Sequence, residues 1–238
     1  MRISIVGTGR AGTSFALALE LAGHAVKLLH HDELGSIGNC EVLLLCVPDD
    51  AIAEVASQVS PSHDRLVAHV AGSRTLEVLA PHPRVGSLHP LITLPSGEIG
   101  AGRLLGATYC VAGDPSVLAL VGSLEGRIIT LSDAQRTAYH ATAVVAANHL
   151  VALMGHVATL AESAGLCLED FLPLAHQALL DVGEVGPLAA LTGPASRGDM
   201  ATIDAHLAAI PELERSTYVA MANAAFELAE QRRAQASA

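Results

Sequence analysis

A glycine-rich run near the N-terminus has the spacing in this chain that points most directly to a chemistry. Residues 7–12 read G-T-G-R-A-G, after a β-branched run at 3–6 and before an Ala/Leu-rich stretch at 13–21. Between a strand and a helix, G-x-G-x-x-G allows a tight turn, close approach of a pyrophosphate and close helix–strand packing. The first N–H groups of the helix would then face the anion. The alternative is a glycine-rich turn in another α/β protein. The run predicts a dinucleotide site at Gly7, Thr8, Gly9, Arg10, Ala11 and Gly12.

The end of the second expected strand, residues 25–30, bears on which dinucleotide binds. An acid at this place usually holds the ribose hydroxyls of NAD, but the strand ends on His30 and His31. Histidine does not repel a 2′-phosphate, and Arg10 in the glycine loop could add positive charge. The pattern favours NADP over NAD. The alternative is that Asp32 does the usual work for NAD.

Two further segments lie where strands are expected to end. Ligands of open α/β sheets bind at the carboxyl ends of strands. Val47, Pro48, Asp49 and Gly72 are therefore expected to edge the nicotinamide end of the site. Asp49 is equally well explained as the cap of a helix, and the nearby His69 as a core histidine.

Two histidines and an asparagine are the candidates for catalysis. His89 ends a short expected strand, and His140 and Asn148 lie on a long apolar helix. Histidine titrates near neutrality and can act as a general acid. At 100° per residue, His140 and Asn148 are about 80° apart on one broad helix face. For His89 the alternative is a histidine that caps a loop.

The segment 191–199, L-T-G-P-A-S-R-G-D, breaks the helical pattern of the second half with polar residues. Arg197 has the geometry to clamp a carboxylate through two hydrogen bonds. Thr192, Arg197 and Asp199 are the candidate substrate-binding residues. The alternative is a structured turn in which Asp199 caps the next helix.

Composition limits the class of protein. The 238 residues are 51% hydrophobic and 3% aromatic, with a formal net charge of −11. That charge argues against nucleic acid or an anionic membrane as a partner. The most apolar stretch, 141–153, is interrupted by Asn148 and His149 and is expected to be a buried helix, too short to span a bilayer. Without a signal-peptide pattern, and with four scattered cysteines expected to be reduced core residues, the chain is predicted to be cytoplasmic.

The pattern of elements predicts an α/β fold followed by an all-α region. Strands and helices alternate up to residue 132, which implies a doubly wound, mostly parallel sheet. From residue 133 the chain is helical almost to its end, with one helix expected over 134–164. We therefore expect a Rossmann-like domain at 1–132 and a helical substrate and dimerisation domain at 133–238. Because the long helix is apolar around most of its circumference, we expect a homodimer through the C-terminal helices. No convergent metal ligands are recognised among the twelve histidines.

Six segments together resemble a family of NADP oxidoreductase-like proteins with an N-terminal Rossmann-like domain and a C-terminal helical domain of unknown function. They are G-T-G-R-A-G at 7–12, V-P-D-D-A-I at 47–52, S-L-H-P-L at 87–91, Y-H-A at 139–141, Asn148 and L-T-G-P-A-S-R-G-D at 191–199. The resemblance implies a relative of the 6-phosphogluconate and β-hydroxyacid dehydrogenase superfamily, similar to ketopantoate reductase. That superfamily carries a lysine four residues before the asparagine, where this chain has Val144, which leaves His140 as the nearest titratable substitute.

Three functions remain open from the sequence. The first is an NADP(H)-dependent oxidoreductase that reduces a small 2-oxo acid of the ketopantoate type. Either His140 or His89 would protonate the oxygen, Asn148 and Thr192 would bind the substrate, and Arg197 would hold its carboxylate. The second is an imine or sugar-acid reductase or dehydrogenase. The third is a dinucleotide-binding sensor or scaffold without catalysis.

Overall fold

The computed structural model describes residues 1–95 and 97–236 and divides the chain into two compact units. Unit 1 is Met1–Ala147 and unit 2 is Asn148–Ala238. The boundary expected at 132/133 marks the start of helix α5 (Asp133–Val144), which is part of unit 1.

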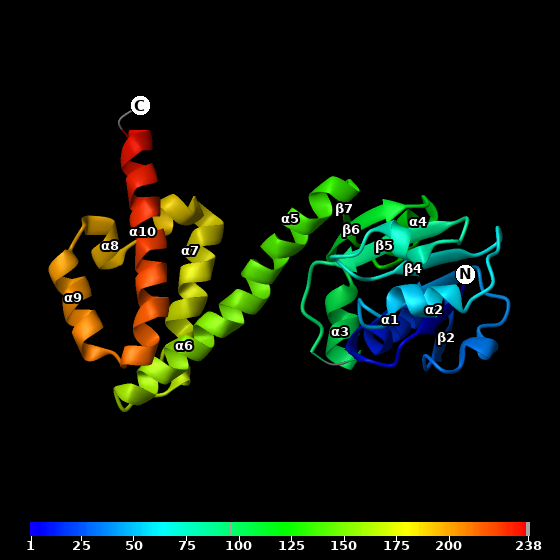
Figure 1. Ribbon diagram of the computed structural model, residues 1–238, viewed down its shortest axis with the longest axis horizontal. Helices are drawn as coiled ribbons and strands as arrows, with labels where there is room; N and C mark the ends of the chain where they lie inside the picture. The colour runs from blue at the N-terminus through cyan, green and yellow to red at the C-terminus, as the bar shows by residue number, and fades with distance from the viewer. Residues whose placement is uncertain (96, 237–238) are drawn as a thin grey trace. The chain divides into compact units, whose positions relative to one another are not determined.

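A seven-stranded sheet forms the centre of unit 1 (Figure 1). Every neighbouring pair is parallel except the antiparallel pair β5–β6. The doubly wound, mostly parallel sheet expected from the sequence is therefore confirmed. The strand order is β2 (Ala25–Leu29), β1 (Arg2–Val6), β3 (Val42–Leu45), β4 (Leu66–His69), β5 (Val85–Pro90), β6 (Thr108–Gly113) and β7 (Arg127–Thr130).

Helices cover the two faces of this sheet and form two hydrophobic clusters. Helices α1 (Arg10–Leu21), α3 (Gly97–Leu104) and α4 (Ser116–Ser123) contribute to one cluster. The other cluster contains α2 (Ile52–Ser57) and the 3-10 turn Leu76–Leu79. All four side chains of β3 are buried, which accounts for its continuous apolar run.

Helix α3 was not expected from the sequence because glycine at 97, 100 and 102 lowers helix propensity. Packing against α1 explains two of these glycines. A Cβ at Gly97 would lie 2.8 Å from Thr13 Oγ1, and one at Gly100 would lie 2.0 Å from Ser14 Oγ. Tertiary packing therefore outweighs propensity in this segment.

The long helix expected at 134–164 is present, with an irregular middle. Helix α5 starts at a capping box between Ser132 and Gln135, a π-helical turn occupies Val145–His149, and α6 covers Leu150–Ser163. A π turn is wider than an α turn. The assumed 100° per residue does not hold through it, so the expected 80° between His140 and Asn148 is not supported.

Residues 133–163 form one helix that is long and apolar enough to cross a membrane by length and composition. Its best window has a mean hydropathy of 1.6, and none of that window is buried in the single chain. The expectations that this stretch is too short to span and that it is buried are both wrong for the single chain. In its first turns, however, Arg136 and Tyr139 bond to side chains of β5, so this end packs on the sheet.

Unit 2 is entirely helical apart from its connections, as expected. Helix α7 (Leu172–Ala190) is kinked at Gly186, which has a φ of 80° and is followed by Pro187. Among the described residues of the unit, those buried in the single chain are Ala161, Ala195, Ile203 and Ala229. The remaining helices are α8 (Gly193–Arg197), α9 (Met200–Ala209) and α10 (Arg215–Ala236).

Candidate functional site

The glycine loop connects β1 to α1 at the carboxyl edge of the sheet, beside the point where strand order reverses between β1 and β3. Gly7 has φ +116°, and a Cβ there would lie 2.3 Å from the carbonyl oxygen of Cys46. A Cβ at Gly12 would lie 1.7 Å from the Gly7 oxygen. A Cβ at Gly9 would meet nothing within 4 Å, and Gly9 is the N-cap of α1, which has no side-chain cap. The loop thus leaves room at Gly9 and uncapped helix N–H groups, which fits a pyrophosphate.

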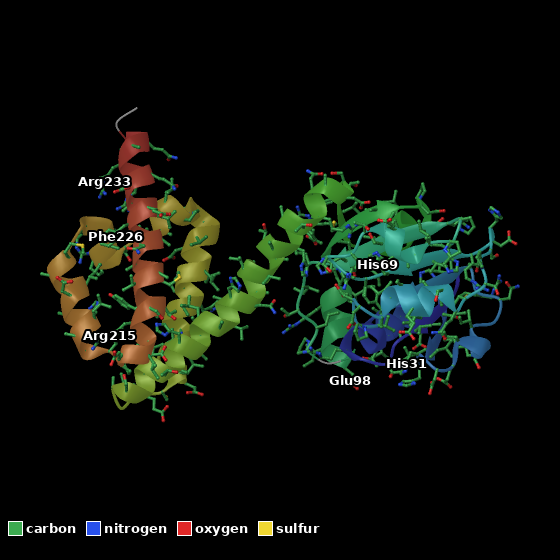
Figure 2. All side chains as sticks on the ribbon, viewed as in Figure 1. His31, His69, Glu98, Arg215, Phe226 and Arg233 are labelled. Carbon is green, nitrogen blue, oxygen red and sulfur yellow. The ribbon has the colours of Figure 1, made fainter. Side chains whose placement is uncertain are left out.

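The residues after β2 form a small polar cluster around His30. Its ring Nδ1 lies 2.7 Å from Asp32 Oδ1, and its backbone N–H donates to Glu33 Oε2 at 2.8 Å. The rings of His30 and His31 lie 4.1 Å apart, and His31 is labelled in Figure 2. The hydrogen bond from His30 lowers the pKa of Asp32. Both acids at this strand end are therefore already engaged with His30.

The ends of β3 and β4 are joined by a side-chain hydrogen bond. Ser73 Oγ donates to Asp49 Oδ2 at 2.5 Å. Helix α2 takes Ala51 as its N-cap, so the helix-capping alternative for Asp49 is wrong. The bond connects the segments that carry Val47, Pro48 and Gly72, which the sequence analysis assigned to one edge of the site.

His89, Tyr139 and His140 gather around Gly72, just beyond β4. Tyr139 Oη lies 2.7 Å from His89 Nδ1, with the two rings edge to face. A Cβ at residue 72 would lie 2.9 Å from His89 Nε2, His89 Cε1 and His140 Cδ2. Only glycine lets both rings approach the backbone this closely. His89 turns a ring nitrogen toward Gly72, whereas His140 turns a carbon.

One face of the sheet carries a strip of polar side chains beneath α5. His69 pairs in register with Ser87, and His89 with Cys110, so all four point to the same face. Arg136 reaches this strip from α5 and donates from Nη2 to Ser87 Oγ at 2.9 Å. Its side chain is 1% exposed, and its Nε and Nη1 have no hydrogen-bond partner among the described residues.

Burial controls protonation in this strip. It lowers the pKa of His69 to about 4, and the Arg136 charge acts in the same direction. It also lowers the pKa of His89 to about 4, with His140 adding to the effect. Both imidazoles are therefore neutral at neutral pH. Burial raises the pKa of Tyr139 to about 12, so its phenol keeps its proton. Figure 2 shows His69 among the strands of unit 1.

The candidate residues of unit 2 lie on and beside helix α8. Thr192 precedes the helix, and Arg197 ends it with an exposed side chain. Asp199 accepts from the Thr202 backbone N–H and from Thr202 Oγ1, so its carboxylate caps α9. Arg232 of α10 donates to the backbone oxygen of Leu191 at 3.0 Å and fixes the start of this segment. Asn148 lies in the π turn.

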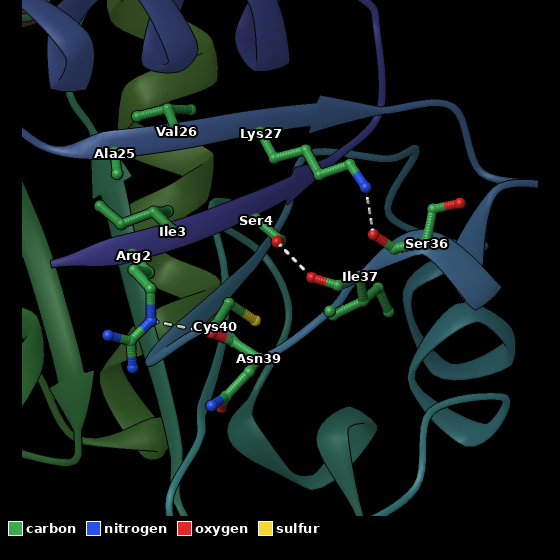
Figure 3. Close-up of a pocket in the computed structure, with 11 residues that line it drawn as sticks. Arg2, Ile3, Ser4, Ala25, Val26, Lys27, Ser36, Ile37, Asn39 and Cys40 are labelled. Atoms are coloured by element: carbon green, nitrogen blue, oxygen red, sulfur yellow. Dashed lines mark hydrogen bonds between the residues drawn. The ribbon is translucent and has the colours of Figure 1, made fainter.

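A pocket of about 300 Å³ lies at the amino ends of β1 and β2, away from the glycine loop (Figure 3). Its polar side chains serve the fold. Lys27 Nζ donates to the Ser36 oxygen at 2.5 Å, Ser4 Oγ to the Ile37 oxygen at 2.9 Å, and Arg2 Nε to the Asn39 oxygen at 2.9 Å. We therefore place the candidate site at the carboxyl edge, where the glycine loop lies.

Residues 108–225 match a family model described as a domain of unknown function (DUF2520). A search of curated proteins finds no match. The fold is similar to that of a protein from Bacteroides fragilis provisionally named an NADP oxidoreductase, with a TM-score of 0.79 at 23% identity over 95% of this chain and 98% of that one.

Two solved enzymes share the fold at lower identity. A reductive aminase from Aspergillus terreus, solved with NADPH and ethyl levulinate, has a TM-score of 0.68 at 15% identity over 97% of this chain and 94% of that one. A pyrroline carboxylate reductase from Plasmodium falciparum, solved with NADP, has a TM-score of 0.62 at 13% identity over 98% and 97%. The chain is thus distantly similar in structure to NADP-dependent oxidoreductases.

Sequence reasoning missed several side chains that organise the site. Arg136 precedes His140 by four residues and Tyr139 by three, which places the three on one helix face. Ser87 and His89 are two residues apart in a strand, so their side chains lie on the same face. These periodicities were available from the sequence. The link from Ser73 to Asp49 was not, because it depends on how two strand ends meet.

Proposed function

We propose that this protein is an NADP(H)-dependent reductase of a small molecule that carries a C=O or C=N bond. The observation that supports it best is the grouping at one sheet edge of an uncapped glycine loop and a histidine–tyrosine pair beside Gly72. A dinucleotide on the loop extends along the carboxyl ends of the strands. A reduced nicotinamide bound there would supply hydride, and either His140 or His89 would supply the proton.

The cofactor we propose is NADP(H), with NAD as the alternative. In an NAD site, a free acid after the second strand holds the ribose hydroxyls. Here Asp32 and Glu33 are both hydrogen-bonded to His30, whose ring lies 4.1 Å from that of His31 at an angle of 50°. An imidazole pair beside the exposed Arg10 suits a 2′-phosphate better than a ribose diol. The relatives solved with NADPH or NADP support the same choice.

For the substrate we propose a small 2-oxo acid of the ketopantoate type. Arg197 is exposed at the end of α8, and its guanidinium would bind a substrate carboxylate through two hydrogen bonds. Thr192 and Asn148 would hydrogen-bond the same molecule. The second candidate is an imine. It is favoured by the names of the reductive aminase and pyrroline carboxylate reductase among the structural relatives.

A turnover panel tests this proposal. NADPH absorbance is followed after addition of ketopantoate, of a neutral oxo ester and of a cyclic imine. We expect oxidation with ketopantoate, and we expect Arg197→Leu to raise its KM about tenfold or more without changing that of the oxo ester. Faster turnover of the imine than of ketopantoate would contradict the 2-oxo acid as substrate and favour the imine in its place. NADPH binding without turnover of any compound would contradict the enzyme and leave the sensor hypothesis.

We also propose a cytoplasmic homodimer formed through the helices of unit 2. In the single chain, large apolar side chains stay exposed, including Val151 at 71% and Leu174 at 69%. So much exposed apolar surface, with so few buried residues, is typical of an interface. A bilayer is a poorer occupant, because Asn148 and His149 lie within the apolar helix.

A charge placed on this surface tests the dimer. In Val151→Glu a carboxylate would be buried without a partner, so we expect the dimer to weaken by roughly 100-fold or more. Light scattering after size-exclusion chromatography measures the mass. Leu21→Glu is the matched control, since Leu21 is 77% exposed on unit 1 and should leave the dimer intact. Equal masses for Val151→Glu and the unaltered protein would contradict an interface at α6.

A further inference from the structure

The two nitrogens of His89 face two different partners. Nδ1 lies 2.7 Å from Tyr139 Oη. Nε2 lies on the other side of the ring, 2.9 Å from the position that a Cβ at residue 72 would occupy. An imidazole in this position connects a half-buried phenol to the backbone at Gly72, beyond the carboxyl end of β4, so it can pass a proton through the ring.

Protonation states give this connection a direction. His89 is neutral and Tyr139 is protonated at neutral pH, because burial lowers the pKa of the first to about 4 and raises that of the second to about 12. A neutral imidazole carries one proton, and the nitrogen without it accepts a hydrogen bond. The bond between Tyr139 and His89 can run in either direction, and the relay requires the phenol to donate to Nδ1, which puts the remaining imidazole proton on Nε2, facing Gly72.

We propose that Tyr139 and His89 form a proton relay in which His89 Nε2 protonates the substrate at Gly72 and Tyr139 Oη replaces that proton through Nδ1. The relay deepens the proposed function and rests on it. It assigns the proton donor to His89, with Tyr139 behind it. The atom of His140 nearest to this position is Cδ2, a ring carbon, and we assign His140 to lining the site.

The step balances for a carbonyl substrate. A reduced nicotinamide would supply the hydride for the new C–H bond, and the electron pair of the C=O π bond would take the Nε2 proton to form O–H. Nδ1 then takes the phenolic proton, which leaves the Tyr139 phenolate. After the product leaves, Nε2 takes a proton from water and Nδ1 returns its proton to the phenolate, which restores the starting state. An alkoxide is more basic than a phenolate, so the transfer is downhill.

Arg136 is the positioning residue of this relay. Its buried guanidinium lowers the pKa of Tyr139 against the larger, raising effect of burial. The charge therefore favours the phenolate left by the proton transfer. Arg136 also holds Ser87, the neighbour of His89 on the same strand face, through its 2.9 Å hydrogen bond.

The relay distinguishes between the two proposed substrate classes. A carbonyl needs one proton for each hydride that it receives, whereas an iminium ion already carries its proton. The relay therefore suits an unprotonated C=O bond and gives no advantage for an iminium. This separates the two substrate candidates by chemistry that belongs to unit 1 alone.

The variant Tyr139→Phe tests the relay, and the chain contains a matched control. His206 Nδ1 and Tyr218 Oη lie 2.6 Å apart with rings edge to face at 88°, against 89° for His89 and Tyr139. Tyr218→Phe therefore removes the same kind of pair from unit 2.

Nitrogen NMR of isotope-labelled histidine reads the His89 tautomer without any substrate. We expect the Nε2–H form in the unaltered protein and in Tyr218→Phe, and a mixture of both tautomers in Tyr139→Phe. A proton on Nδ1 in the unaltered protein would overturn the relay.

Turnover gives the second readout. We expect Tyr139→Phe to lower kcat for the carbonyl substrate about 100-fold or more, the usual size of a proton-transfer contribution, with the NADPH KM unchanged. A preformed iminium should lose much less. Carbonyl turnover that survives in Tyr139→Phe would overturn the relay and leave the reductase standing. No carbonyl turnover by the unaltered protein would overturn both.

Discussion

Replacing Gly9 with valine should reduce NADPH affinity about 100-fold or more and leave the fold intact, because the new side chain would occupy the approach of the pyrophosphate. Gly9 has φ −75° and ψ −172°, an extended conformation that any residue adopts. No heavy atom lies within 4 Å of an added Cβ, so the protein itself has room for a side chain. Nicotinamide fluorescence gives the affinity, and thermal melting checks the fold.

The choice of Gly9 separates ligand binding from folding. At Gly12 a Cβ would lie 1.7 Å from the Gly7 oxygen, so a substitution there would disturb the loop itself. Gly122→Val is the matched control, because Gly122 is exposed and also has no heavy atom within 4 Å of an added Cβ. Unchanged NADPH binding by Gly9→Val would mean that the glycine loop does not hold the pyrophosphate.

Acidification should destabilise unit 1 well above the pH at which carboxylates titrate. His69 is fully buried, and its pKa falls from 6.5 to about 4 on folding. Between these values the unfolded chain binds more protons, so stability is present above pH 6.5 and is lost as the pH falls. From neutrality to about pH 5, linkage gives a loss of about 2 kcal/mol from His69 alone. His89 shifts in the same direction.

Urea unfolding at a series of pH values measures this effect. His69→Gln removes the titration with a similar shape, so we expect its stability to depend less on pH in this window. His63→Gln is the control, since His63 follows α2 on the surface of unit 1. Asp114, whose pKa is lowered by its hydrogen bond to Arg84, loses its contribution only at more acidic pH. Equal pH dependence in His69→Gln and the unaltered protein would show that another group is responsible.

The fold followed from local patterns that the structure kept. The alternation of strands and helices up to residue 132 predicted the doubly wound, mostly parallel sheet. Helix α3 was not predicted, because its glycines are explained by close packing against α1. The sequence around these glycines does not indicate that contact. The π turn at Val145–His149 escaped for a related reason, since nothing in its composition differs from an α-helix.

The candidate site was predictable where strand ends determine it. The glycine loop, Asp49, Gly72 and His89 all lie at the carboxyl edge, as a parallel sheet requires. The partners of these residues were harder to predict. The contact of Tyr139 with His89 spans fifty positions, and it exists because α5 returns to cover the strip on β5.

Three of the four cysteines are buried as expected, whereas Cys167 is exposed, so its expected core role is wrong.

The most direct test of the central claim is a fluorescence titration of the unaltered protein with NADPH and with NADH. We expect saturable NADPH binding that is at least about tenfold tighter than NADH binding, because His30 and His31 replace a free acid at the ribose. If neither NADPH nor NADH binds, the dinucleotide site and the reductase proposed on it are both contradicted.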